Sequence, residues 1–126
     1  MDWQSILQSS INKHLLIAAL LGAIIGLERE LSGKDPSLRT FALISVGSCV
    51  FSMLSIFVTI GAVSNADPGR IAAQIIPGIG FLGAGTIFRS KRGISGLTTA
   101  ALMWVTAGIG MAVGLDRIDL AVSTTI

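Results

Sequence analysis

Five polar residues lie where apolar stretches of the sequence begin or end, and their types suit binding. A carboxylate, a guanidinium and three hydroxyls could together hold an ion, a phosphate group or a polar side chain of a partner. A simpler interpretation also stays open, in which the carboxylate and the guanidinium pair at the membrane boundary and fix a helical hairpin. The five candidate binding residues are Glu28, Arg39, Thr40, Thr98 and Thr99.

Other kinds of chemistry have little support in the sequence. There is one histidine, no tyrosine and one cysteine, so neither a Ser-His-Asp set nor a Cys-His set is expected to form. We therefore expect no enzyme and no cofactor. Magnesium prefers carboxylate oxygens, and the carboxylates lie at the edges of the apolar runs, so Mg²⁺ stays a candidate ligand without a defined site. The formal net charge of +2, without a basic face that carries interleaved aromatics, argues against nucleic-acid binding.

The composition indicates an integral membrane protein. Hydrophobic residues make up 52% of the 126 residues and charged residues 13%, whereas soluble domains carry about 25% charged residues. The mean hydropathy is +0.79. The uncharged runs 40–66, 71–88 and 93–115 are each long enough to cross a hydrocarbon core of roughly 30 Å. We expect residues 1–126 to form a single transmembrane domain in contact with the lipid bilayer.

The expected fold class is all-α, a membrane-embedded helical bundle with four transmembrane helices and the start of a fifth. Asp-Pro pairs favour helix starts, because Asp is a good N-cap and Pro suits the first helical position. Pro77 lies in the middle of the third run and predicts a kink or a break, since proline has no N–H to donate. The helices are expected over about residues 11–31, 35–60, 67–88 and 95–114, with residues 120–126 opening the fifth.

Small residues predict where these helices pack, because they allow close approach of backbones in a membrane. A hydroxyl face on the second helix, formed by Ser45, Ser48, Ser52 and Ser55 with Thr59, is either a packing seam or the wall of a polar pathway. The sequence alone leaves both interpretations open. The glycines expected at packing contacts are Gly22 and Gly26 in the first helix, and Gly78, Gly80, Gly83 and Gly85 in the third.

The distribution of Lys and Arg predicts the orientation. Loops 28–39 and 89–93 carry most of the basic residues, and the positive-inside rule places such loops in the cytoplasm. The N-terminus is then outside, and the protein is expected to be a multi-pass protein of the bacterial inner membrane.

Several motifs occur in an order that resembles the MgtC/SapB family of bacterial inner-membrane proteins. They are Gly26-Leu-Glu-Arg-Glu30, Leu38-Arg-Thr40, Arg70-Ile-Ala-Ala-Gln74, Gly78-Ile-Gly-Phe-Leu-Gly-Ala-Gly85, and Gly96-Leu-Thr-Thr-Ala-Ala101 with Trp104. The resemblance implies a hydrophobic domain of about five helices, which many members follow with a soluble cytoplasmic domain that is absent here. It also implies a link to low-magnesium stress and to virulence inside macrophages, through regulation of other membrane machinery such as ATP synthase. Some members have Asn in place of Thr98 and Cys in place of Val105.

Two functions therefore compete. The first is a small regulatory membrane protein that binds a membrane partner or a second copy of itself, with a homodimer favoured because few helices enclose little volume. The alternative is a transporter or channel for a cation such as Mg²⁺ or for a small anion, formed by an oligomer. Pro77, the glycines of the third helix and the hydroxyl face of the second helix motivate this alternative.

Overall fold

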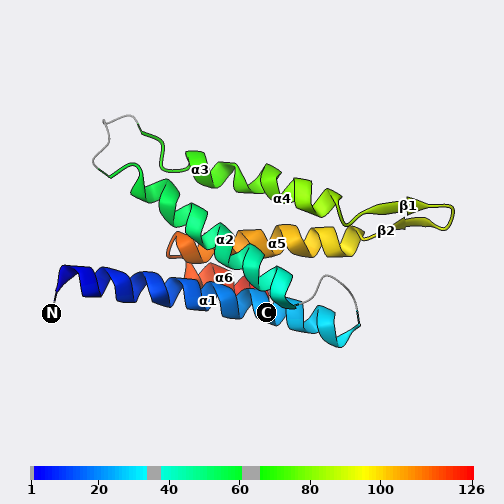
Figure 1. Cartoon of the computed structure of the whole chain (residues 1–126), viewed down its shortest axis with the longest axis horizontal. Coiled ribbons are helices and arrows are strands. Elements are labelled where there is room, and N and C mark those ends of the chain that lie inside the picture. Colours follow the sequence, from blue (N-terminus) through cyan, green and yellow to red (C-terminus); the bar gives the residue numbers. More distant parts are fainter. Residues whose placement is uncertain (1, 34–37, 61–65) are drawn as a thin grey trace.

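The computed structural model describes residues 2–33, 38–60 and 66–126, and that part of the chain is mostly helical (Figure 1). Long helices lie alongside one another, and a thin two-stranded hairpin extends from one end of the molecule. The elements in chain order are α1 (Trp3–Leu31), α2 (Leu38–Phe57), α3 (Arg70–Ala73), α4 (Ile75–Ala84), β1 (Phe88–Ser90), β2 (Gly93–Ser95), α5 (Leu97–Gly114) and α6 (Ile118–Thr125).

The backbone of α2 lies in close contact with both α1 and α5. On the α1 side, a Cβ atom added to Gly22 would lie 2.6 Å from the carbonyl oxygen of Phe41, and one added to Gly26 would collide with Leu38. On the α5 side, a Cβ atom added to Gly114 would lie 2.6 Å from the carbonyl oxygen of Cys49. Glycines on two helices thus let α2 sit between them, as small residues do in membrane bundles.

The hydroxyl face of α2 is a packing seam. Ser45, Ser48 and Ser52 are buried, and a Cβ atom added to Gly110 of α5 would meet the backbone of Ser45 and the side chain of Ser48. Farther along the same face, the Ser55 hydroxyl donates to the carbonyl oxygen of Pro68 and accepts from the N–H of Ala72 at 3.1 Å. The serines therefore join α2 to α5 and to the start of α3.

Three of the four expected spans are supported by helix length. In the described part of the chain, Gln4–Leu31, Leu38–Phe57 and Leu97–Gly114 are long and apolar enough to cross a membrane. The third expected span is a shorter apolar segment, Arg70–Ala84, interrupted at Gln74. At about 1.5 Å per residue it reaches no more than about 22 Å. The prediction of a fourth full-length helix is thus not confirmed.

The interruption of this segment follows from Pro77. Proline cannot donate to the carbonyl four residues earlier, and its ring clashes with that carbonyl. The residue four positions before Pro77 is Ala73, and α3 ends there. The prediction of a break near Pro77 is confirmed.

The all-α prediction is wrong for residues 88–95, where the end of one helix, the loop 89–93 and the start of the next helix were expected. β1 and β2 pair antiparallel in the register Phe88↔Ser95 and Ser90↔Gly93, so a two-residue loop connects them. Gly93 has φ +113° and Gly96 has φ +88°, conformations that favour glycine. These two glycines close the hairpin and delay the start of α5 to Leu97.

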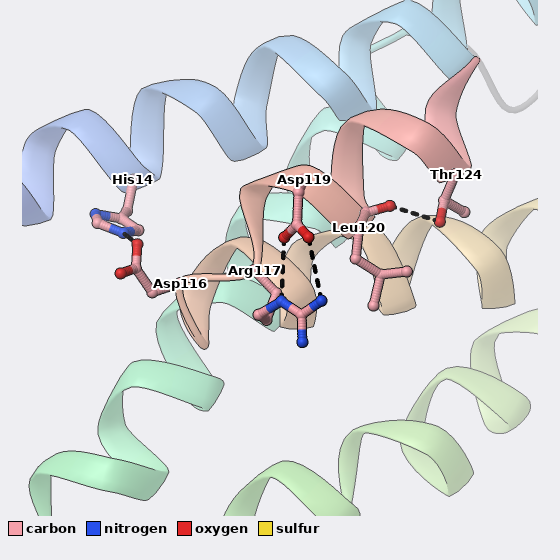
Figure 2. A network of polar contacts seen from close by, with 6 residues as sticks. All are labelled: His14, Asp116, Arg117, Asp119, Leu120 and Thr124. Atoms are coloured by element: carbon pink, nitrogen blue, oxygen red, sulfur yellow. Dashed lines mark hydrogen bonds and ion pairs between the residues drawn. The ribbon is translucent and has the colours of Figure 1, made fainter.

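Polar contacts at the opposite end of the molecule tie α1 to the turn between α5 and α6 (Figure 2). His14 Nε2 lies 2.9 Å from Asp116 Oδ1, and His14 Nδ1 lies 2.7 Å from the carbonyl oxygen of Ser10. An ionised carboxylate and a carbonyl only accept, so it is the protonated imidazole, with a donor on each ring nitrogen, that satisfies both contacts.

A second ion pair lies next to this contact in Figure 2. Both Nε and one terminal nitrogen of Arg117 donate to the Asp119 carboxylate at 3.1 Å. These hydrogen bonds lower the pKa of Asp119. In the described residues, the ion pairs are this one and His14–Asp116.

Candidate functional site

A polar cavity of about 820 Å³ lies where the last turn of α1 meets the end of α4, the hairpin and the first turn of α5. In Figure 1 this region is the end of the molecule from which the hairpin extends. The cavity is lined by Arg29, Gly85, Thr86, Phe88, Ile94, Ser95, Gly96, Leu97, Thr98 and Thr99. The lining combines a guanidinium, several hydroxyls and a helix N-terminus.

Arg29 is the buried charge of this cavity, with 5% of its surface exposed. A terminal nitrogen of its guanidinium donates to Thr99 Oγ1 at 2.7 Å, and Thr99 is itself buried. Nε of Arg29 is buried and has no hydrogen-bond partner among the described residues. A buried guanidinium is usually paired with an anion, because desolvating an unpaired charge is costly. Among the residues that the structure describes, the hydrogen-bond partner of Arg29 is a neutral hydroxyl.

The helical repeat of α1 explains why Arg29 is buried. Ala18, Gly22 and Gly26 follow one another at intervals of four residues and are all buried on one face. Arg29 comes three residues after Gly26, so it continues the same face. The burial of Arg29 was not predicted from the sequence, although its position three residues after the glycine pair Gly22 and Gly26 was a signal that could have identified it.

The first turn of α5 presents free donors to the cavity. Its N-cap, Gly96, has no side chain that could accept from the helix, and no side-chain cap is formed. The first backbone bond of the helix runs from the N–H of Ala100 to the carbonyl of Gly96, at 2.9 Å. The preceding N–H groups of Leu97, Thr98 and Thr99 have no backbone acceptor within the described ranges, so they are orphan donors of the kind that satisfy anions at helix N-termini.

The structure brings Thr98 and Thr99 together with Arg29 but places the other predicted binding residues elsewhere. Glu28 is exposed and accepts from the Ser32 hydroxyl at 3.3 Å. Arg39 is exposed on α2 and does not form an ion pair with Glu28. Thr40 lines a different cavity. Of the five, Thr98 and Thr99 thus share the polar cavity, and Glu28, Arg39 and Thr40 lie outside it.

That second cavity is an apolar groove of about 650 Å³ between α2 and the α3–α4 segment. We call it the α2–α4 groove. It is lined by Thr40, Leu43, Ile44, Gly47, Ser48, Phe51, Ile71, Gln74, Ile75, Gly78, Ile79, Leu82 and Met103. Its surface suits lipid tails or an apolar helix, whereas the polar cavity suits an oxyanion.

The α4 glycines, which were expected to pack, have different surroundings. A Cβ atom added to Gly78 or Gly80 would meet no atom within 4 Å, and Gly78 lines the α2–α4 groove. Gly83 faces Ala100 of α5 at an ordinary contact distance of 3.4 Å. Gly85 lines the polar cavity. Gly78 and Gly80 therefore leave space open instead of closing a contact within the described chain.

The chain is similar in sequence to a known protein family and to several curated proteins. Residues 15–126 match the family model described as MgtC family. An uncharacterized protein of Haemophilus influenzae is 47% identical over 122 residues, which cover 92% of this chain and 51% of that protein. Protein MgtC of Salmonella typhimurium (strain LT2) is 48% identical over 113 residues, covering 90% of this chain and 47% of the relative.

A third relative carries a name that refers to transport. The putative magnesium transporter YhiD of Escherichia coli (strain K12) is 44% identical over 113 residues, covering 86% of this chain and 53% of the relative. The chain thus spans about half the length of the curated relatives it matches. No solved structure matches it.

Proposed function

Because the chain belongs to the MgtC family, we propose that it is a regulatory protein of the bacterial inner membrane under magnesium limitation. In this proposal it acts by binding another membrane protein. Its relatives include Protein MgtC and a putative magnesium transporter, which supports a magnesium-related membrane role. The protein would act by associating with its partner within the bilayer.

The main support for this proposal is that α5 covers the hydroxyl face of α2. The serines that could have lined a polar pathway are buried against Gly110 and Gly114 of α5. A permeating ion needs a row of polar groups that it can reach, and this row is occupied by helix packing. A single copy of the chain is therefore better suited to binding than to conduction.

We propose that the partner contributes an apolar transmembrane helix to the α2–α4 groove. The groove is lined mainly by aliphatic side chains, and its lining includes Gly47 and Gly78. A Cβ atom added to either glycine would meet no neighbour within 4 Å. Glycines that face open space in a membrane allow a helix backbone to approach closely. A second copy of this chain, forming a homodimer, is the alternative occupant.

A matched pair of glycine variants on α4 tests this proposal. Gly78→Leu would fill the α2–α4 groove, whereas Gly80→Leu adds the same side chain on the same helix outside the groove lining. We expect Gly78→Leu, but not Gly80→Leu, to abolish rescue of low-magnesium growth in a bacterium that lacks its own copy of this gene. Membrane levels of both variants are measured by immunoblot.

A photo-crosslinking residue in place of Phe51, which also lines the groove, identifies the occupant. A crosslink to another membrane protein that is lost in Gly78→Leu supports the proposal, and a crosslink between two copies assigns the groove to the homodimer. Growth rescue by stably inserted Gly78→Leu at the wild-type level would contradict it.

Transport is the second candidate function, and two observations favour it. The Escherichia coli relative is named a putative magnesium transporter, and the break at Gln74 is of a kind that occurs in transporters. Purified chain in proteoliposomes that contain a magnesium-sensitive dye separates the two functions. Mg²⁺ entry above that of protein-free liposomes, in proportion to the protein added, would replace the regulatory proposal with transport.

A further inference from the structure

The geometry points to a binding site for a phosphate group in the polar cavity, with Arg29, Thr98, Thr99 and the N-terminus of α5 as its donors. The phosphate group would belong either to a lipid head group or to free inorganic phosphate. This site lies apart from the α2–α4 groove and is independent of the regulatory proposal.

The charge of Arg29 gives the first reason. Its guanidinium is buried and lacks a carboxylate partner in the described chain, where the ion pairs are His14–Asp116 and Arg117–Asp119. The two acidic neighbours along the helix, Glu28 and Glu30, are exposed on other faces of α1. An anion that entered the cavity would neutralise the guanidinium and could accept from nitrogens that now lack partners.

The convergence of donors gives the second reason. Thr99 Oγ1 accepts from Arg29, so the hydroxyl hydrogen of Thr99 remains available to donate. Thr98 and Ser95 add hydroxyls from the same lining, and α5 is an 18-residue helix whose first N–H groups have no side-chain cap. A tetrahedral group with several oxygens can use a guanidinium and a helix N-terminus at once.

The hairpin supplies the third reason. Phe88 and Ile94 line the cavity, and Arg89 pairs with Ile94 in the strand register. Arg89 therefore lies beside the cavity, while Lys91 and Arg92 are at the tip of the hairpin, farther out, and all three are exposed. Exposed positive charge beside a cleft raises the local concentration of anions. The size of the cavity, about 820 Å³, leaves room for a group attached to the phosphate.

Calorimetric titration of the full chain in dodecyl maltoside, a phosphate-free detergent, tests the site. The probes are inorganic phosphate, short-chain phosphatidylglycerol, and the matching diacylglycerol, which lacks the phosphate. We expect the wild type to bind inorganic phosphate or phosphatidylglycerol and not to bind diacylglycerol. Binding of inorganic phosphate identifies a soluble ligand, and binding of phosphatidylglycerol alone identifies a lipid head group. Binding of neither would overturn the inference.

Substitutions test whether the measured binding takes place in this cavity. Arg29→Gln is expected to weaken binding of the active probe at least about tenfold, the scale of a lost charge-assisted contact. Arg29→Lys should recover part of the lost affinity. Arg39→Gln removes a positive charge from an exposed position outside the cavity and should bind as the wild type does. Equal affinity in folded Arg29→Gln would overturn the inference.

A second variant keeps the test decisive if the Arg29 substitutions do not yield folded protein. Thr98 is exposed to the cavity, so Thr98→Val together with Ser95→Ala removes two hydroxyls without opening the core. We expect this double variant to elute as the wild type does on size exclusion and to bind the active probe several-fold more weakly. Wild-type affinity in the double variant would then count against the site.

Discussion

Gly96 links the hairpin to α5, and its conformation shapes the polar cavity. Its φ of +88° lies in the left-handed region, where an L side chain costs about 1–2 kcal/mol. A Cβ atom at this position would also collide with the carbonyl oxygen of Thr86. Gly96 therefore allows the chain that leaves α4 to lie against the N-terminus of α5. The donors of Thr98 and Thr99 depend on that contact.

We predict that Gly96→Ala lowers stability by about 2 kcal/mol or more, the sum of backbone strain and a collision with backbone. Gly93→Ala is the control, because Gly93 also has positive φ but a Cβ atom there would meet nothing within 4 Å. Thermal unfolding in detergent can be followed by maleimide labelling of Cys49, a buried free thiol. Equal melting temperatures for the two variants would refute the role of the Thr86 contact.

At the scale of elements, the seam between α2 and α5 organises the bundle. Glycines of α5 lie against the backbone and serines of α2, so the helices meet through small residues and not through large apolar side chains. Contacts of this kind depend on shape and leave little tolerance for added atoms. The register of α5 along α2 is set by Gly110 and Gly114.

Neighbouring glycines of α5 should respond to alanine in opposite directions. Gly110→Ala is predicted to destabilise by about 1–3 kcal/mol or more, because its Cβ would collide with the Ser45 backbone. Gly108→Ala adds the same methyl group where no atom lies within 4 Å, and better helix propensity should stabilise by up to about 1 kcal/mol. The same labelling assay compares them. If Gly108→Ala lowered stability as much as Gly110→Ala does, packing at the seam between α2 and α5 would not be the cause of the destabilisation.

At the scale of the whole molecule, polar groups lie in two regions, one toward each end of the bundle drawn in Figure 1. The end of α1, the hairpin and the start of α5 lie at one end with the polar cavity. The N-terminus, the start of α3 and the turn between α5 and α6 lie toward the other end, and this turn holds Asp116, which contacts His14. Apolar helices with polar groups at both ends match a protein that crosses a bilayer. Which end faces the cytoplasm remains a prediction from the basic residues of 28–39 and 89–93.

Labelling of introduced cysteines tests that orientation. Ser90→Cys in the hairpin should be protected from a membrane-impermeant maleimide in cells with a permeabilised outer membrane, and should react after lysis. Ala66→Cys, exposed before α3, should react in both conditions. The parent chain is a suitable background because Cys49 is buried. Reaction of Ser90→Cys before lysis, with protection of Ala66→Cys, would reverse the topology.

Local chemistry made several features predictable from the sequence. Membrane character follows from the scarcity of charge, and the break before α4 follows from the missing N–H of Pro77. Thr98 and Thr99 were also placed correctly near the start of a helix, since residues before them cannot continue the apolar run. The hairpin was missed because two strands of three residues leave too short a pattern to be distinguished from a turn.

By itself, the sequence determined that this chain is an apolar helical protein of the MgtC family, because composition and local motifs carry that information. Only the tertiary structure decided which polar groups meet. Successive residues on a helix point about 100° apart, so burial of Gly22 and Gly26 against α2 turns Arg29 inward to Thr99 and leaves Glu28 exposed. The charge in the cavity is set by the face on which α1 packs, and that face is chosen by contacts with α2 and α5.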